Sequence, residues 1–99
     1  MTSTKCQKGD FMFINKTSNG RNNICGENIA RIRKNMKISQ RFLADKLQLI
    51  GLNIDKNAIQ RMESGQRFIT DIEIIYLSKV LGVTFDELLN FDAKKDLPW

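Results

Sequence analysis

Hydrophobic side chains recur at steps of three and four residues between positions 27 and 91, a spacing that predicts amphipathic helices. Ile29, Ile32 and Met36 form the first such stripe. No stretch of this sequence shows the sustained alternation of polar and apolar residues expected of a half-buried strand. The pattern therefore predicts an all-α fold with five short helices, at about 27–36, 39–50, 55–64, 70–81 and 84–91.

Capping residues mark the expected ends of these helices. Ser39 and Asp55 stand where an N-cap oxygen accepts a hydrogen bond from a first-turn N–H. Thr70 and Thr84 are each followed three residues later by a glutamate, which predicts a capping box at two further helix starts. The glycines expected in a left-handed conformation after a helix are Gly51, Gly65 and Gly82.

The periodic positions also predict which side chains are buried. In the second and third helices, the residues expected to face each other across the turn and form the core are Leu43, Leu47, Ile59 and Met62. In the fourth helix, the expected apolar stripe is Ile72, Ile75, Tyr76 and Val80. Such a helix pair cannot bury its own stripes, so the remaining helices are expected to close the core behind it.

Residues 1–26 differ from the rest of the chain, because they are rich in polar residues and lack an apolar period. We therefore expect three parts: an N-terminal extension of uncertain order at 1–26, a helical domain at 27–91 and a short tail at 92–99. Four basic residues against Asp10 make the extension basic. It is interpreted as a flexible segment, with a DNA-contacting arm and a dimer contact through Phe11, Phe13 and Ile14 as alternatives.

Composition narrows the classes of function. The chain has 99 residues and a mass of 11.4 kDa, the size of one small domain. It contains no histidine, and its cysteines, Cys6 and Cys25, lack the spacing of metal ligands. We therefore expect no enzyme activity, no metal and no cofactor. The weak N-terminal apolar run and the absence of any segment long enough to span a membrane predict a cytoplasmic protein without a membrane partner.

The charge is concentrated in one part of the helical region. The whole chain carries +5, which favours an anionic partner. Between Arg31 and Arg67, nine basic residues stand against three acidic ones, a net charge of +6. Between Phe68 and Phe91, one lysine stands against four acidic residues, a net charge of −3. The first of these segments is therefore the expected site of anion binding.

The run ISQRFLADKLQLIGLNIDKNAIQRMESGQRF, followed by ITDIEIIYLSKVLGVTFDELL, resembles the Cro/C1-type helix-turn-helix domain of phage repressors and xenobiotic-response-element regulators. The resemblance extends from about Glu27 to Asn90. It implies a five-helix, lambda-repressor-like fold with Ala44 as the small residue between helices two and three. It also implies a sequence-specific regulator of transcription, expected to be a repressor, whose partner is a double-stranded DNA operator.

The resemblance also implies roles for individual residues. The third helix would enter the major groove, where amide and guanidinium groups pair with the edges of purines. The residues implied to contact bases are Lys56, Asn57, Gln60 and Arg61. Those implied to contact the DNA backbone are Gln40, Arg41, Ser64, Gln66 and Arg67. Arg33 and Glu63 occupy the positions of a structural ion pair that orients the third helix.

The chain departs from the common family pattern between the second and third helices. The twelve-residue step from Leu47 to Ile59 is longer than usual, which leaves the docking angle of the third helix open. We expect a longer second helix, with the enlarged connection packed by its apolar residues Leu49, Ile50, Leu52 and Ile54.

A homodimer is expected, because one such domain makes few base contacts. The candidate dimer surface is the fifth helix and the tail, with Phe91, Leu97 and Trp99; closure of the core is the other interpretation of these side chains. No small-molecule ligand is expected. The alternative function is a protein-interaction module, for example an antitoxin-like partner of another protein, that keeps this fold without specific DNA binding.

Overall fold

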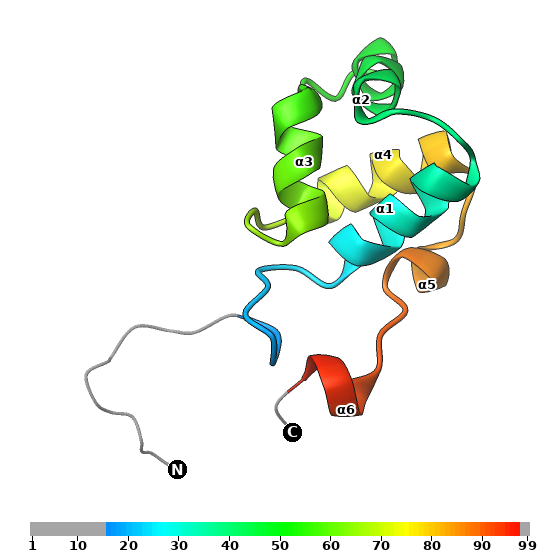
Figure 1. Cartoon of the computed structure of the whole chain (residues 1–99). Coiled ribbons are helices and arrows are strands. Elements are labelled where there is room, and N and C mark those ends of the chain that lie inside the picture. Colours follow the sequence, from blue (N-terminus) through cyan, green and yellow to red (C-terminus); the bar gives the residue numbers. More distant parts are fainter. Residues whose placement is uncertain (1–15, 98–99) are drawn as a thin grey trace.

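The computed structural model of the chain describes residues 16–97, and these residues form six helices (Figure 1). The predictions for Cys6, Phe11, Phe13, Ile14 and Trp99 concern residues outside this range. The helices are α1 (Cys25–Asn35), α2 (Gln40–Leu49), α3 (Lys56–Ser64), α4 (Asp71–Leu81), α5 (Phe85–Leu88) and α6 (Ala93–Asp96). None of the six has the length and apolarity needed to span a bilayer. The all-α prediction is confirmed for the described part of the chain.

The first five helices pack around one hydrophobic core. Helix α1 packs against α3 and α5, while α2 packs against α3 and α4. The predicted core residues Leu43, Leu47, Ile59 and Met62 are fully buried, and Ala44 is nearly so. Burying a side chain of this size stabilises the fold by about 1.5–3 kcal/mol. Helices α1 and α4 therefore cover the apolar residues of α2 and α3, as the sequence predicts.

The predicted helix caps are confirmed. The Ser39 hydroxyl accepts a hydrogen bond from the N–H of Phe42 at 3.0 Å, and the Asp55 carboxylate accepts one from the N–H of Ala58 at 2.8 Å. Thr70 and Thr84 each form a complete capping box. The glycines with positive φ after α2, α3 and α4 are Gly51, Gly65 and Gly82.

In the C-terminal part of the chain, one predicted helix end is wrong and one helix was not predicted. Helix α5 ends at Leu88, not at residue 91, and a sixth helix follows it. The side chain of Asn28 in α1 donates to the carbonyl oxygens of Leu88 and Asn90 at 2.7 and 2.9 Å. In a longer helix, backbone N–H groups further along the chain would bond to these carbonyl groups. The Asn28 amide supplies those hydrogen bonds instead, so the helix ends there.

Half of the predicted apolar stripe of α4 is confirmed, because Tyr76 and Val80 pack against the core, and the other half is wrong. Ile72 is 60% exposed and Ile75 is 58% exposed, whereas Leu77 and Leu81 are buried and Ile74 packs against the core. The sequence of α4 is apolar on several sides, so its periodicity does not select one face. Packing against α2 and α5 makes the choice instead.

The connection between α2 and α3 is packed by only part of its apolar set. Ile54 is buried and Leu52 packs against the core, but Leu49 is 78% exposed and Ile50 is also exposed. The amide of Gln48 donates to the carbonyl oxygen of Ile54 at 2.6 Å and thereby holds the loop against the end of α2. The expectation that Leu49 and Ile50 pack the loop is wrong, because the chain turns away from them at Gly51.

Candidate nucleic-acid interface

Helix α3 has a buried face and a solvent face. Ala58, Ile59 and Met62 point into the core. Asp55 caps the first turn, and Gly65 ends the helix in a left-handed conformation with φ of 85°. The helix thus begins and ends where its own sequence specifies, and packing determines which side it exposes.

The four residues predicted to contact bases all lie on the exposed side of α3. At 100° per residue they span about 140° of the helix surface, and Ser64 falls within the same arc. The set is Lys56, Asn57, Gln60 and Arg61. Two cationic side chains and two amides thus share one continuous solvent face, where they can donate to acceptors on a ligand and, through the amides, accept from it.

The N-terminus of α2 contributes a second exposed group next to α3. Arg41 is exposed in the first turn of α2. Gln40 is half-buried, and its amide nitrogen donates to Oε1 of Glu63 at 2.9 Å. The start of α2 also carries the positive end of the helix dipole, which favours an anion. Gln40 is therefore tied to α3, while Arg41 faces solvent.

Arg33 and Glu63 form a bidentate ion pair between α1 and α3. Arg33 Nε lies 2.7 Å from Glu63 Oε2, and Arg33 Nη2 lies 3.0 Å from Oε1. Arg33 Nη1 also donates to the carbonyl oxygen of Ile38 at 2.8 Å. Both side chains are largely buried, so removing one partner would leave the other charge buried without compensation. The pair therefore fixes the position of α3 relative to α1 and α2.

The loop after α3 contains two of the residues predicted to contact the DNA backbone, and they differ in their surroundings. Gln66 is exposed, but Arg67 donates two hydrogen bonds to Glu73, at 2.9 and 2.8 Å. Burial opposes ionisation of the Glu73 carboxyl, yet the bonds from Arg67 and from the N–H of Thr70 outweigh it and hold its pKa below the ordinary value. The same ion pair raises the pKa of Arg67. Arg67 is thus held against α4.

Three residues that the sequence did not single out contact the end of α3. Arg21, Asn22 and Asn23 donate hydrogen bonds to carbonyl oxygens between Met62 and Arg67. They fall in the segment interpreted as a flexible extension. One local signal was present, because Asn23 accepts a hydrogen bond from the N–H of Gly26, the spacing of an N-cap interaction.

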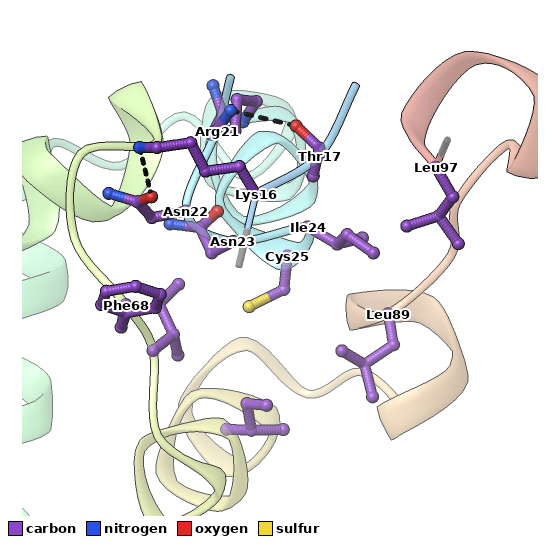
Figure 2. Close-up of a pocket in the computed structure, with 12 residues that line it drawn as sticks. Lys16, Thr17, Arg21, Asn22, Asn23, Ile24, Cys25, Phe68, Leu89 and Leu97 are labelled. Carbon is purple, nitrogen blue, oxygen red and sulfur yellow. Dashed lines mark hydrogen bonds between the residues drawn. The ribbon is translucent and has the colours of Figure 1, made fainter. Parts of the chain in front are cut away.

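A groove of about 320 Å³ lies on the other side of the same segment (Figure 2). Its apolar wall includes Phe68, Ile74, Leu89 and Leu97, and the thiol of Cys25 lies among these side chains. Burial raises the pKa of the Cys25 thiol to about 11. A thiol in this state is a packing group, because the reactive thiolate is scarce at neutral pH.

Comparison with known proteins gives a family and two solved structures. The helix-turn-helix family model matches residues 29–88. The restriction-modification controller protein C.AhdI from Aeromonas hydrophila is 25% identical, with a TM-score of 0.57; the match covers 65% of this chain and 89% of that chain. The P22 c2 repressor in complex with a synthetic operator is 29% identical, with a TM-score of 0.58, and the match covers 70% and 97%. No curated protein matches the chain in sequence.

Proposed function

The chain belongs to the Cro/C1-type helix-turn-helix family of DNA-binding transcriptional regulators, and we propose that it represses transcription by binding a specific operator with α3. The observation that carries the proposal is the solvent face of α3, where Lys56, Asn57, Gln60 and Arg61 stand together. One solved relative is a repressor in complex with an operator, and the other is a controller protein.

The proposed reading mechanism follows from the chemistry of this face. An α-helix fits the major groove of B-DNA, and its N-terminal residues meet the base edges. The amides of Asn57 and Gln60 match the N6 and N7 groups of adenine, and Arg61 matches O6 and N7 of guanine. Lys56 lies at the first helical position, from which it reaches either a base or a phosphate.

Phosphate contacts would come from the groups that flank α3. Arg41 is exposed in the first turn of α2, and Ser64 and Gln66 are exposed at the end of α3 and in the loop that follows it. We assign Gln40 and Arg67 a smaller share, since each is bound to a carboxylate within the chain. Phosphate contacts fix the register of the protein without reading sequence.

We further propose that the operator is bound by a homodimer in the cytoplasm. A two-fold pair of domains places two α3 helices in half-sites about one helical turn apart. Around α5, the exposed apolar side chains suited to an interface are Phe85, Leu89 and Phe91. Leu97 is half-buried against the groove, so its contribution to such a surface is smaller.

The test begins with selection of bound sites from random duplex DNA by the full chain. We expect an enriched, two-fold symmetric sequence. Arg61→Ala should then weaken binding to the selected duplex about tenfold or more and relax preference at one base pair. Lys79→Ala is the matched control, because it removes one exposed positive charge from α4, a helix with no residue assigned to DNA contact.

Two results of these measurements would contradict the proposal. If a folded sample enriches no sequence, or if Arg61→Glu and Asn57→Ala leave DNA affinity unchanged at low salt, then α3 does not read DNA. The protein-interaction module would then be the better interpretation.

A further inference from the structure

The C-terminal end of α3 is held by hydrogen bonds from outside the helix-turn-helix unit. Arg21 Nη2 lies 2.8 Å from the carbonyl oxygen of Glu63, and Asn23 Nδ2 lies 3.0 Å from that of Met62. These carbonyls belong to the last turn of α3, whose carbonyl groups lack the N–H four residues on; Met62 also accepts from the N–H of Gly65 at 3.2 Å. The guanidinium of Arg21 also places a positive charge at the negative end of the helix dipole.

The loop that follows α3 is held by the same segment. Asn22 donates its backbone N–H to Gly65 at 2.7 Å and its side-chain amide to Gln66 at 2.9 Å. Asn23 Nδ2 donates a second bond, 2.7 Å long, to the carbonyl oxygen of Arg67. Five carbonyl groups between residues 62 and 67 therefore receive hydrogen bonds from three consecutive residues.

Residues 16–23 have a defined conformation of their own (Figure 2). Thr17 accepts a hydrogen bond from the N–H of Arg21 on its hydroxyl and donates its own N–H to the carbonyl oxygen of Arg21. Lys16 Nζ donates to the side-chain oxygen of Asn22 at 2.8 Å. A further bond, from the N–H of Ser18 to the carbonyl oxygen of Asp96, attaches the turn to α6. The side chains that donate to α3 therefore come from a turn that is held by its own hydrogen bonds and by one bond to α6.

The fit against α3 leaves little free space. A Cβ atom at Gly65 would lie 2.8 Å from two side-chain carbons of Arg21. The side chain of Arg21 is only 14% exposed, and its Nε is buried with no hydrogen-bond partner. A buried N–H without a partner costs free energy, so the remaining contacts of Arg21 must outweigh that cost.

We propose that residues 16–23 form a clamp that positions α3 for reading DNA, with Arg21 and Asn23 as positioning residues that do not themselves contact bases. This inference rests on the proposed function of α3. The N-terminal end of the helix is capped by Asp55, and its last turn is anchored by the clamp and by the Arg33–Glu63 pair. Loosening the clamp would let the last turn shift, and Gln60 and Arg61 would move relative to the bases.

The primary test is Asn23→Asp in the full chain, with Asn19→Asp as its matched control. An aspartate at position 23 keeps the oxygen that accepts from Gly26 but loses both donated bonds to α3 and its loop. Asn19→Asp introduces the same charge in the same turn and keeps the oxygen that accepts from Thr17. The difference between the two variants is therefore the clamp and not the added charge.

Binding is measured on two probes: the duplex selected by the unaltered chain and a mixed-sequence duplex of equal length. At a temperature where both variants are fully folded, we expect Asn23→Asp to bind the selected duplex about tenfold more weakly than Asn19→Asp. Both should bind the mixed-sequence duplex equally. A purely structural loss would lower both affinities together, so the ratio between the probes distinguishes positioning from stability.

Hydrogen exchange without DNA gives a second measurement. We expect faster amide exchange at residues 65–67 in Asn23→Asp and in Arg21→Met, with no change in α2. Arg21→Met keeps the apolar stem over Gly65 and removes the donors, so it replaces Asn23→Asp if that variant does not fold. Lys94→Met is its charge control in the nearby helix α6.

The outcomes separate this inference from the function on which it rests. If Arg61→Ala weakens binding to the selected duplex but Asn23→Asp and Arg21→Met match their controls in binding and exchange, the clamp does not position α3. If Arg61→Ala has no effect and exchange at 65–67 rises in the clamp variants, the clamp holds the helix and the DNA-reading role of α3 is wrong.

Discussion

Lys37 adopts a backbone conformation that glycine tolerates better. It follows α1 with φ of 62°, the left-handed region, and its N–H bonds to the carbonyl oxygen of Lys34 at 3.0 Å. A side chain with a Cβ is strained in this conformation, by roughly 1–2 kcal/mol. The positive charge near the end of α1 offsets a part of that cost.

Lys37→Gly is expected to raise the free energy of unfolding by about 0.5–1 kcal/mol, because it removes the strain at a left-handed position. Urea denaturation followed by circular dichroism measures the change. Lys34→Gly is the control: the same replacement within α1 should lower stability by about 1 kcal/mol. A loss of stability in both variants would show that the conformation of residue 37 is not a source of strain.

Glu73 couples the loop after α3 to the first turn of α4. Its pKa is held below the ordinary value, so its contribution is complete above the carboxylate's ordinary pKa and is lost as pH falls through the lowered one. Glu73→Gln should cost about 2 kcal/mol at pH 7, because Arg67 loses its charged acceptor.

The pH dependence provides the check on Glu73. As pH falls below the ordinary pKa of a glutamate, unfolding experiments should show a steeper loss of stability for the unaltered chain than for Glu73→Gln, so the two curves converge at low pH. Glu87→Gln at the equivalent position of α5, which is exposed, is the comparison. Parallel curves for the unaltered chain and Glu73→Gln would contradict the role assigned to the ion pair.

At the scale of elements, the contact between α1 and α3 depends on Gly26. A Cβ at this position would overlap the carbonyl oxygen of Met62 and would lie 2.8 Å from Arg21 Nη2. The start of α1, the end of α3 and the clamp therefore meet at a residue without a side chain. Helix propensity and packing make opposite predictions here.

Gly26→Ala is expected to lower the free energy of unfolding by about 2 kcal/mol, since the methyl group must displace backbone. Propensity alone would raise it by about 1 kcal/mol. The sign of the change in thermal or urea unfolding thus decides between the two. A stabilised variant would mean that α1 and α3 can separate without cost.

The ends and buried faces of the helices differ in how well the sequence predicts them. Helices with distinct caps, such as α2 and α3, were predicted to within a residue, because Ser39, Asp55 and Gly65 act on their own neighbours. The length of α5 was predicted wrongly, and so were Ile72 and Ile75, two of the four residues in the predicted stripe of α4. Asn28 and the packing of α2 decide these features, and both lie far away in sequence.

At the scale of the whole molecule, the exposed apolar side chains around α5 are the basis of the proposed dimer. Phe85→Glu is expected to convert a dimer into a monomer in sedimentation experiments, because it places a charge in the interface. A glutamate in the first turn of α5 is compatible with the helix dipole, so the helix itself should persist. Leu49→Glu, on the exposed end of α2, should leave the dimer intact. A dimeric Phe85→Glu variant would exclude this surface.

The sequence by itself determined the helical class, four helix caps, the buried pair of helices α2 and α3 and the set of polar residues exposed on α3. These features depend on local backbone chemistry and on the period of apolar residues, which neighbouring positions encode. Only the tertiary structure decided that Gln40 and Arg67 are bound to carboxylates within the chain, and that Arg21, Asn22 and Asn23 hold the end of α3. Apart from Arg67 and Glu73, which are six positions apart, those contacts join residues more than 20 positions apart, and no local pattern specifies their partners.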